Sequence, residues 1–193
     1  GTYTSLSGTT SAANPQLAGT VIVDELRPFS FSAYGGTVKG DLRVRVIRSN
    51  ADNTLDFYWW FSNDASSAGA IGSLRLGQFY SPEYDAEYRT DSLGSVGPDL
   101  AYRFDPPQDD YINFSYSSGL QPGETSKGIF LDTSATDYVT AGRLDLTNVS
   151  QTDRSSAFSI YRPLLLGDVD LNGVVDAADV DDFIAVLQGS ETD

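Results

Sequence analysis

Apolar and polar side chains alternate along most of the chain, which is the pattern of a half-buried β-strand. The alternation is clearest at 29–33 and at 42–46, where two arginines fall on the polar face of the second run. A polar turn at 50–53 joins that run to the aromatic run 54–62, and this order predicts a hairpin. Further strands are expected at 17–23, 73–80, 100–104, 110–116, 127–132 and 157–162.

Turn residues, including those at 141–142, separate these strands, and no amphipathic helix precedes residue 176. The pattern predicts a mainly β protein, an antiparallel β-sandwich of jelly-roll or immunoglobulin-like type, followed by a short C-terminal loop and helix. The loops 63–72 and 80–99 are long in this scheme, and such loops often carry binding sites. We expect three parts: an extended N-terminal segment at 1–16, a sandwich at 17–163, and the loop with its helix at 164–193.

Charge and composition exclude several classes of function. The 193 residues include 27 acidic and 12 basic side chains, for a net charge of −15, which disfavours binding to nucleic acid or anionic lipid. The absence of Cys and His excludes thiol chemistry, imidazole catalysis, and zinc or copper sites built on these ligands. No run of about 18 apolar residues occurs, so we expect no membrane span. Metal binding would depend on oxygen ligands, which suit hard cations such as calcium.

Residues 168–179 carry oxygen side chains at the spacing of a calcium-binding loop. Gly173 stands at position 6, where such a loop turns sharply, and Val175 at position 8 is expected to point inward. Acids at every second position let one turn direct them all at a single cation, whose charge offsets their repulsion. The predicted Ca²⁺ ligands are the side chains at positions 1, 3, 5, 9 and 12 and the backbone carbonyl at position 7: Asp168, Asp170, Asn172, Asp176, Asp179 and Val174.

The sequence GDVDLNGVVDAADVDDFIAVL at 167–187 resembles one half-repeat of a type I dockerin, a module of secreted bacterial proteins that include those of Planctomycetes. The resemblance implies a calcium loop with Asp rather than Glu at position 12, followed directly by a helix, and Asp179 fits that position. Dockerins generally pair two such repeats, whereas this sequence contains one. The resemblance leaves the rest of the chain unmatched.

An apolar stripe follows the loop. Its residues fall at i, i+3, i+4 and i+7, which predicts an amphipathic helix, and Gly189 would end it. A helix of about three turns is marginal by itself in water, so the stripe needs a surface. That surface is either the chain's own sandwich, beside 164–166, or another molecule. The predicted interaction residues are Val180, Phe183, Ile184 and Leu187.

Aromatic residues occupy both faces of the run 57–61. Tyr58 and Trp60 share one face and could form a platform on which a sugar stacks, although aromatic residues of strands often fill cores instead. Carboxylate pairs such as Glu83 with Glu87 could hydrolyse a glycoside, but 27 acidic residues offer many equivalent pairs. The sequence therefore does not predict an enzyme.

The absence of Met suggests a mature protein from which an N-terminal signal has been removed, and we expect it to be secreted and extracellular. We predict a non-catalytic structural or assembly protein of the matrix, the cell surface or a fibre. Its partners would be further copies of itself in a homopolymer, or another secreted protein. Either the helix or the segment 1–16 would dock on the next copy, the latter as an added strand. The alternative is a carbohydrate-binding module that binds a polysaccharide and is attached to a scaffold through the dockerin-like segment.

Overall fold

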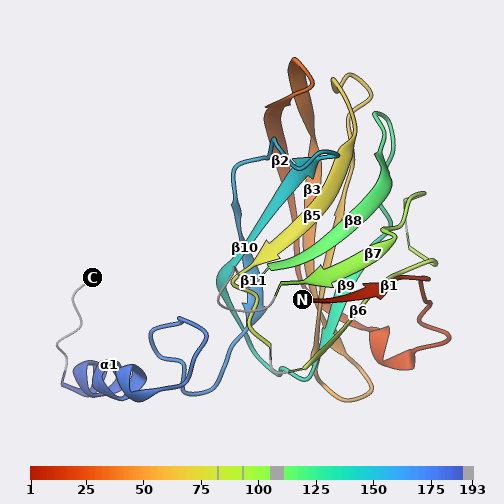
Figure 1. The fold of residues 1–193 in the computed structure, drawn as a ribbon. Helices are drawn as coiled ribbons and strands as arrows, with labels where there is room; N and C mark the ends of the chain where they lie inside the picture. The colour runs from red at the N-terminus through yellow and green to blue at the C-terminus, as the bar shows by residue number, and fades with distance from the viewer. Residues whose placement is uncertain (82, 93, 105–110, 189–193) are drawn as a thin grey trace.

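A computed structural model describes residues 1–81, 83–92, 94–104 and 111–188. Within these residues the chain forms two β-sheets, a short 3-10 helix and one α-helix (Figure 1). The elements are β1 (Thr2–Ser5), η1 (Pro15–Leu17), β2 (Gly19–Ala33), β3 (Gly36–Ser49), β4 (Leu55–Phe61), β5 (Ile71–Gly77), β6 (Tyr84–Tyr88), β7 (Leu100–Arg103), β8 (Tyr111–Leu120), β9 (Ile129–Thr133), β10 (Tyr138–Asn148), β11 (Phe158–Pro163) and α1 (Ala177–Leu187).

The two sheets pack face to face, and the predicted antiparallel β-sandwich is confirmed. One sheet has the strand order β1-β7-β8-β5-β10-β11, and the other has the order β2-β3-β4-β9-β6. Their inward faces share one core, because apolar side chains alternate inward on both sheets. Phe79 joins the β5 end of this core to β4, where its ring lies edge-on to Phe57 and Trp59 at centroid distances of 5.3 and 5.7 Å.

The predicted hairpin around 50–53 is confirmed, since β3 pairs with β4 from Leu42 opposite Phe61 to Arg48 opposite Leu55. The runs 17–23 and 29–33, expected as separate strands, belong largely to the single fifteen-residue strand β2. The charged residues between the runs do not interrupt this strand, because Asp24 pairs with arginines of β3 on the outer face. β2 is an edge strand, which also explains how it accommodates Pro28.

Two strands were not expected. β6 lies inside the segment predicted as the loop 80–99, and β10 spans residues 141–142, which were predicted as a turn. The prediction of a turn there was wrong, because β10 passes this point as a bulge, with a register shift between Thr140 and Gly142. The predicted strand 110–116 corresponds to β8, although Asp110 lies outside the described residues.

The N-terminal segment packs along its own sandwich. β1 forms the edge of the larger sheet beside β7 (Figure 1). Further along, the backbone N–H of Thr9 donates to the carbonyl of Tyr88 at 2.9 Å. Leu17 is then buried, with 2% of its surface exposed, against Ile47, Tyr58 and Phe130 on the outer face of the smaller sheet. In this structure the N-terminal segment therefore pairs and packs with its own sandwich rather than with another copy.

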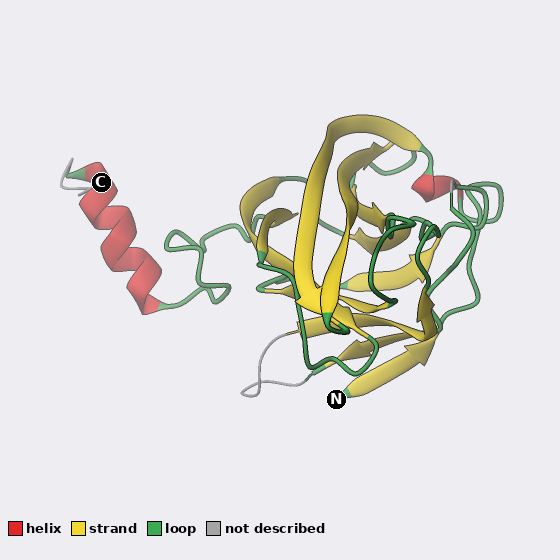
Figure 2. Ribbon diagram, turned by 90° about the horizontal axis from the view of Figure 1, so that it is seen from above, coloured by secondary structure: helices red, strands yellow, loops and turns green. Residues whose placement is uncertain are grey.

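Helix α1 projects away from the sandwich beyond the end of β11 (Figures 1 and 2). It ends at Leu187, and the predicted stop at Gly189 lies outside the described residues. No helix in the described part of the chain has both the length and the apolar character needed to cross a membrane.

Candidate metal centre

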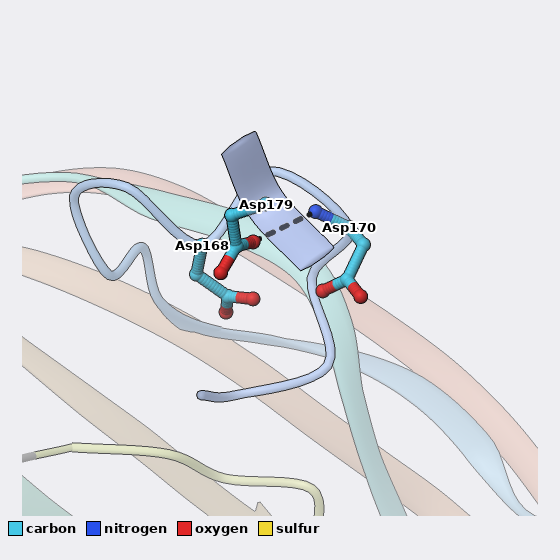
Figure 3. A group of neighbouring side chains, drawn as sticks. All are labelled: Asp168, Asp170 and Asp179. Atoms are coloured by element: carbon cyan, nitrogen blue, oxygen red, sulfur yellow. Dashed lines mark hydrogen bonds between the residues drawn. The ribbon is translucent and has the colours of Figure 1, made fainter. Parts of the chain in front are cut away.

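Three carboxylates meet at the start of α1 (Figure 3). Asp168, Asp170 and Asp179 each place an oxygen within 4.8 Å of the others. Asp168 and Asp179 are buried, whereas Asp170 is exposed. The chain thus gathers three of the six predicted calcium ligands. Their oxygen-only chemistry suits a hard cation, whose charge would offset the repulsion between these acids.

Asp179 links this cluster to the helix. It forms a capping box with Asp176, the N-cap residue of α1: the Asp176 N–H donates to Asp179 Oδ2 at 2.7 Å. Oδ1 of Asp179 accepts the N–H of Val169 at 2.6 Å. These backbone bonds, that from Asp176 first, lower the pKa of Asp179, so its charged form is favoured. A ligand bound to Asp179 would contact the side chain that organises the first turn of the helix.

The other three predicted ligands lie in the same loop and make hydrogen bonds within it. Asn172 donates its amide to Asp170 Oδ2 at 2.7 Å. Its own Oδ1 accepts the N–H of Val174 at 2.8 Å. Asp176 uses Oδ1 to accept the N–H of Ala178 at 2.7 Å. Val175, expected to point inward, is 58% exposed instead, because the loop packs on the sandwich through other residues.

Arg162 at the end of β11 holds the loop on the sandwich. It is fully buried, and its Nη2 lies 3.5 Å from Asp168 Oδ2 and donates to the carbonyl of Leu171 at 2.8 Å. Its guanidinium stacks over the ring of Tyr80, 4.9 Å from the centroid. Arg162 was not among the predicted site residues, although the alternation in β11 places it on the same buried face as Ile160.

Gly173 makes the second contact between loop and sandwich. Its φ of +91° is in the left-handed region, and a Cβ added there would lie 2.1 Å from the Tyr80 ring. We expect Gly173→Ala to displace the loop and to weaken cation binding by about tenfold or more, as isothermal calorimetry with Ca²⁺ would measure.

Gly35→Ala is the matched control for this variant. Gly35 has a similarly positive φ of +71° but open space around the added Cβ. The Gly35→Ala variant is expected to introduce backbone strain without a steric clash, and so to leave Ca²⁺ affinity unchanged. Equal affinity in the two variants would contradict the assigned role of the Tyr80 contact.

The apolar stripe of α1 is uncovered in the described structure. Val180, Phe183, Ile184 and Leu187 are 56, 52, 43 and 70% exposed. Docking on the chain's own sandwich beside 164–166 is not observed, and Leu166 itself is 88% exposed. The loop is held at the end of β11, and the helix leaves from there in a direction that takes it away from both sheets (Figure 2).

A second candidate site lies on the outer face of the smaller sheet. Tyr58 and Trp60 of β4, predicted as a platform, line one cavity of about 400 Å³. The two rings are not both accessible to a ligand. Tyr58 is 4% exposed and packs on Phe130, whereas Trp60 is half-buried. Cross-strand pairing places Arg43 opposite Trp60 and Arg45 opposite Tyr58. Both guanidiniums lie over the Trp60 ring, 5.4 and 4.9 Å from its centroid.

Arg89, which follows β6, completes the cavity wall. It makes a bidentate ion pair with Asp91 at 2.6 and 2.8 Å, and its Nη1 donates to the hydroxyl of Tyr58 at 3.3 Å. Asp91 in turn accepts the N–H of Ser11, so the N-terminal segment helps to fix this wall. The two aromatic residues were predicted as site residues and the arginines were not, because only the strand register brings these side chains together.

Both sites are thus defined by their own residues: a carboxylate cluster at the base of α1 and an aromatic cavity with three arginines. The loop's resemblance to a dockerin half-repeat depends on residues 167–187 alone. Comparison of the chain with protein-family models, with curated proteins and with solved structures finds no match.

Proposed function

We propose that this protein is a secreted, non-catalytic assembly component whose C-terminal loop binds Ca²⁺ and thereby holds α1 ready to dock on another molecule. The observation that carries the proposal is the cluster of Asp168, Asp170 and Asp179 at the base of a helix whose apolar stripe is exposed. Because Asp179 belongs both to the cluster and to the capping box, cation binding would stabilise the helix start.

The ion's ligands would come first from the three clustered carboxylates. Asn172 lies one hydrogen bond from Asp170 and could turn its Oδ1 towards the ion. The ion would supply positive charge to a segment that has no basic residue after Arg162. Arg162 already offsets part of the charge of Asp168. The bound cation and Arg162 would therefore both stabilise the charge of Asp168, and the pair would link the loop to the sandwich.

The exposure of the stripe supports docking in trans. Burying four such side chains would contribute about 1.5–3 kcal/mol each before the entropic cost of association is subtracted. Within the described residues no surface of the chain covers them. The partner would be another copy of the chain, in a head-to-tail homopolymer, or another secreted protein with an apolar groove.

Calorimetry and sedimentation with Ca²⁺ and with EGTA test the proposal. We expect Asp179→Asn to weaken Ca²⁺ binding by about tenfold or more, because it removes a charged ligand. Asp181→Asn, a matched change at an exposed acid outside the cluster, should bind Ca²⁺ as the unchanged protein does.

Association of the protein is expected in Ca²⁺ and should be lost when Phe183 and Leu187 are both changed to Ser. Val149→Ser, at a 46% exposed site on the sandwich, is the control.

Two results would count against the proposal separately. No heat on Ca²⁺ titration would remove the calcium site. A monomer at high concentration in both Ca²⁺ and EGTA would remove the assembly role.

The second candidate function is carbohydrate binding. It is favoured by the cavity that contains Trp60, whose ring is the part of the predicted platform that remains accessible.

A further inference from the structure

The cavity at Trp60 contains more positive than negative charge, in a protein whose net charge is −15. Arg89 and Asp91 neutralise each other as a bidentate pair. Arg43 and Arg45 share a single carboxylate, that of Asp24 on β2. Three arginines and two carboxylates leave this group with one net positive charge, which one anionic group of a ligand would balance.

Arg45 has donor capacity that the protein does not use. It donates to Asp24 through Nη2 at 2.7 Å. Its Nε is buried and has no hydrogen-bond partner among the described residues. A buried N–H of a charged group without an acceptor is costly, so the arrangement is suited to an acceptor that arrives with a ligand. The planar guanidinium favours a carboxylate, which can accept two parallel hydrogen bonds.

We infer that this cavity binds a carboxylated sugar, such as a uronic-acid unit of an acidic polysaccharide. The inference deepens the carbohydrate-binding candidate and is independent of the calcium loop. A cavity of about 400 Å³ is compact and suits one or two rings. The half-buried Trp60 offers an apolar surface for the sugar ring, and the Arg45 guanidinium, which lies over the indole ring, would receive the carboxylate. These features favour an acidic saccharide over a neutral one.

Nuclear magnetic resonance of the ¹⁵N-labelled full chain tests the inference, since the protein has two Trp and hence two indole signals. Trp59 is fully buried and Trp60 lines the cavity, and a Trp60→Phe variant assigns the signals. Digalacturonic acid is titrated in EGTA, so that neither the loop nor the sugar acid holds Ca²⁺. We expect the Trp60 signal to shift with digalacturonic acid and to stay in place with the neutral galactose disaccharide.

Arg45→Gln is expected to raise the dissociation constant for digalacturonic acid by about tenfold or more. Arg48→Gln is the matched control: it lies on the same strand, its Nη1 donates to the carbonyls of Asn53 and Thr136, and it does not line the cavity. This control should bind digalacturonic acid as the unchanged protein does. Circular dichroism establishes that each variant is folded.

Three outcomes would overturn the inference. The neutral disaccharide could bind as tightly as the acid, Arg45→Gln could bind without loss, or neither sugar could shift the Trp60 signal. A peptide of residues 176–188, which is acidic and apolar, is the competing probe. Tighter binding of that peptide would also overturn the inference, and would identify the cavity as a receptor for α1 of another copy. None of these results bears on calcium binding by the loop.

Discussion

Replacing Asp56 by Asn is expected to remove most of the pH dependence of stability between pH 5 and pH 8, and to stabilise the protein at pH 8. Asp56 on β4 lies directly opposite Asp132 on β9, which lies opposite Asp85 on β6. Asp56 is fully buried, and its carboxyl group interacts with the Asp132 side chain rather than with a basic group. Burial, and then the charge of Asp132, raise the pKa of Asp56 to about 8.

The sign of the effect follows from proton binding. The pKa of Asp132 is also raised, mainly by burial, so the folded pair holds a proton that the unfolded chain releases near pH 4. Above that pH the folded state binds more protons, and its stability therefore falls as pH rises towards 8. One proton of difference corresponds to about 1.4 kcal/mol of unfolding free energy per pH unit. The chain contains no His that would add its own titration in this range.

Urea denaturation at pH 5, 6, 7 and 8 measures this slope. The unchanged protein should lose stability steadily, whereas Asp56→Asn should be nearly flat. Asp85→Asn is the control, because it removes one charge from the same cross-strand row at an exposed position and leaves both Asp56 and Asp132 in place. A flat profile in the unchanged protein, or the same slope in Asp56→Asn, would show that the pair does not share a proton.

Arg162→Met is expected to lower the free energy of unfolding by about 3 kcal/mol, because it leaves Asp168 buried without its positive partner. Met retains much of the apolar stem, so the loss reports mainly on charge and hydrogen bonding. The value is placed at the lower end of the range for broken buried pairs, since the loop can detach and hydrate Asp168. Chemical denaturation measures the loss of stability, and hydrogen exchange across 164–176 measures detachment of the loop.

Calcium should reduce the cost of this substitution. Where Arg162 is absent, a cation in the carboxylate cluster becomes the only positive charge close to Asp168 among the described groups. We therefore expect Ca²⁺ to stabilise Arg162→Met more than it stabilises the unchanged protein. Arg143→Met, at an exposed arginine of the neighbouring strand β10, should change stability by no more than about 0.5 kcal/mol. Equal stabilisation by Ca²⁺ in all three proteins would contradict the link between Arg162 and the cluster.

Local pattern was sufficient for most of the secondary structure. Alternation at 42–46 and 54–62 predicted β3, β4 and their hairpin, and the spacing of Val180, Phe183, Ile184 and Leu187 predicted α1. β6 and β10 were missed for a local reason. β6 carries polar side chains on a short edge strand, and β10 contains an Ala–Gly pair that is typical of a turn but here forms a bulge.

The sequence by itself determined the alternation that makes a sandwich, the oxygen-rich loop and the apolar stripe, because each depends on residues a few positions apart. Only the tertiary structure decided that Arg162 holds the loop, that the stripe stays uncovered, and that Asp56 meets Asp132. It also decided that three arginines line the cavity that contains Trp60. These facts depend on strand register and on the path of the chain between distant segments. Neighbouring strands can bring together residues of any sequence separation, so the spacing along the chain does not encode such contacts.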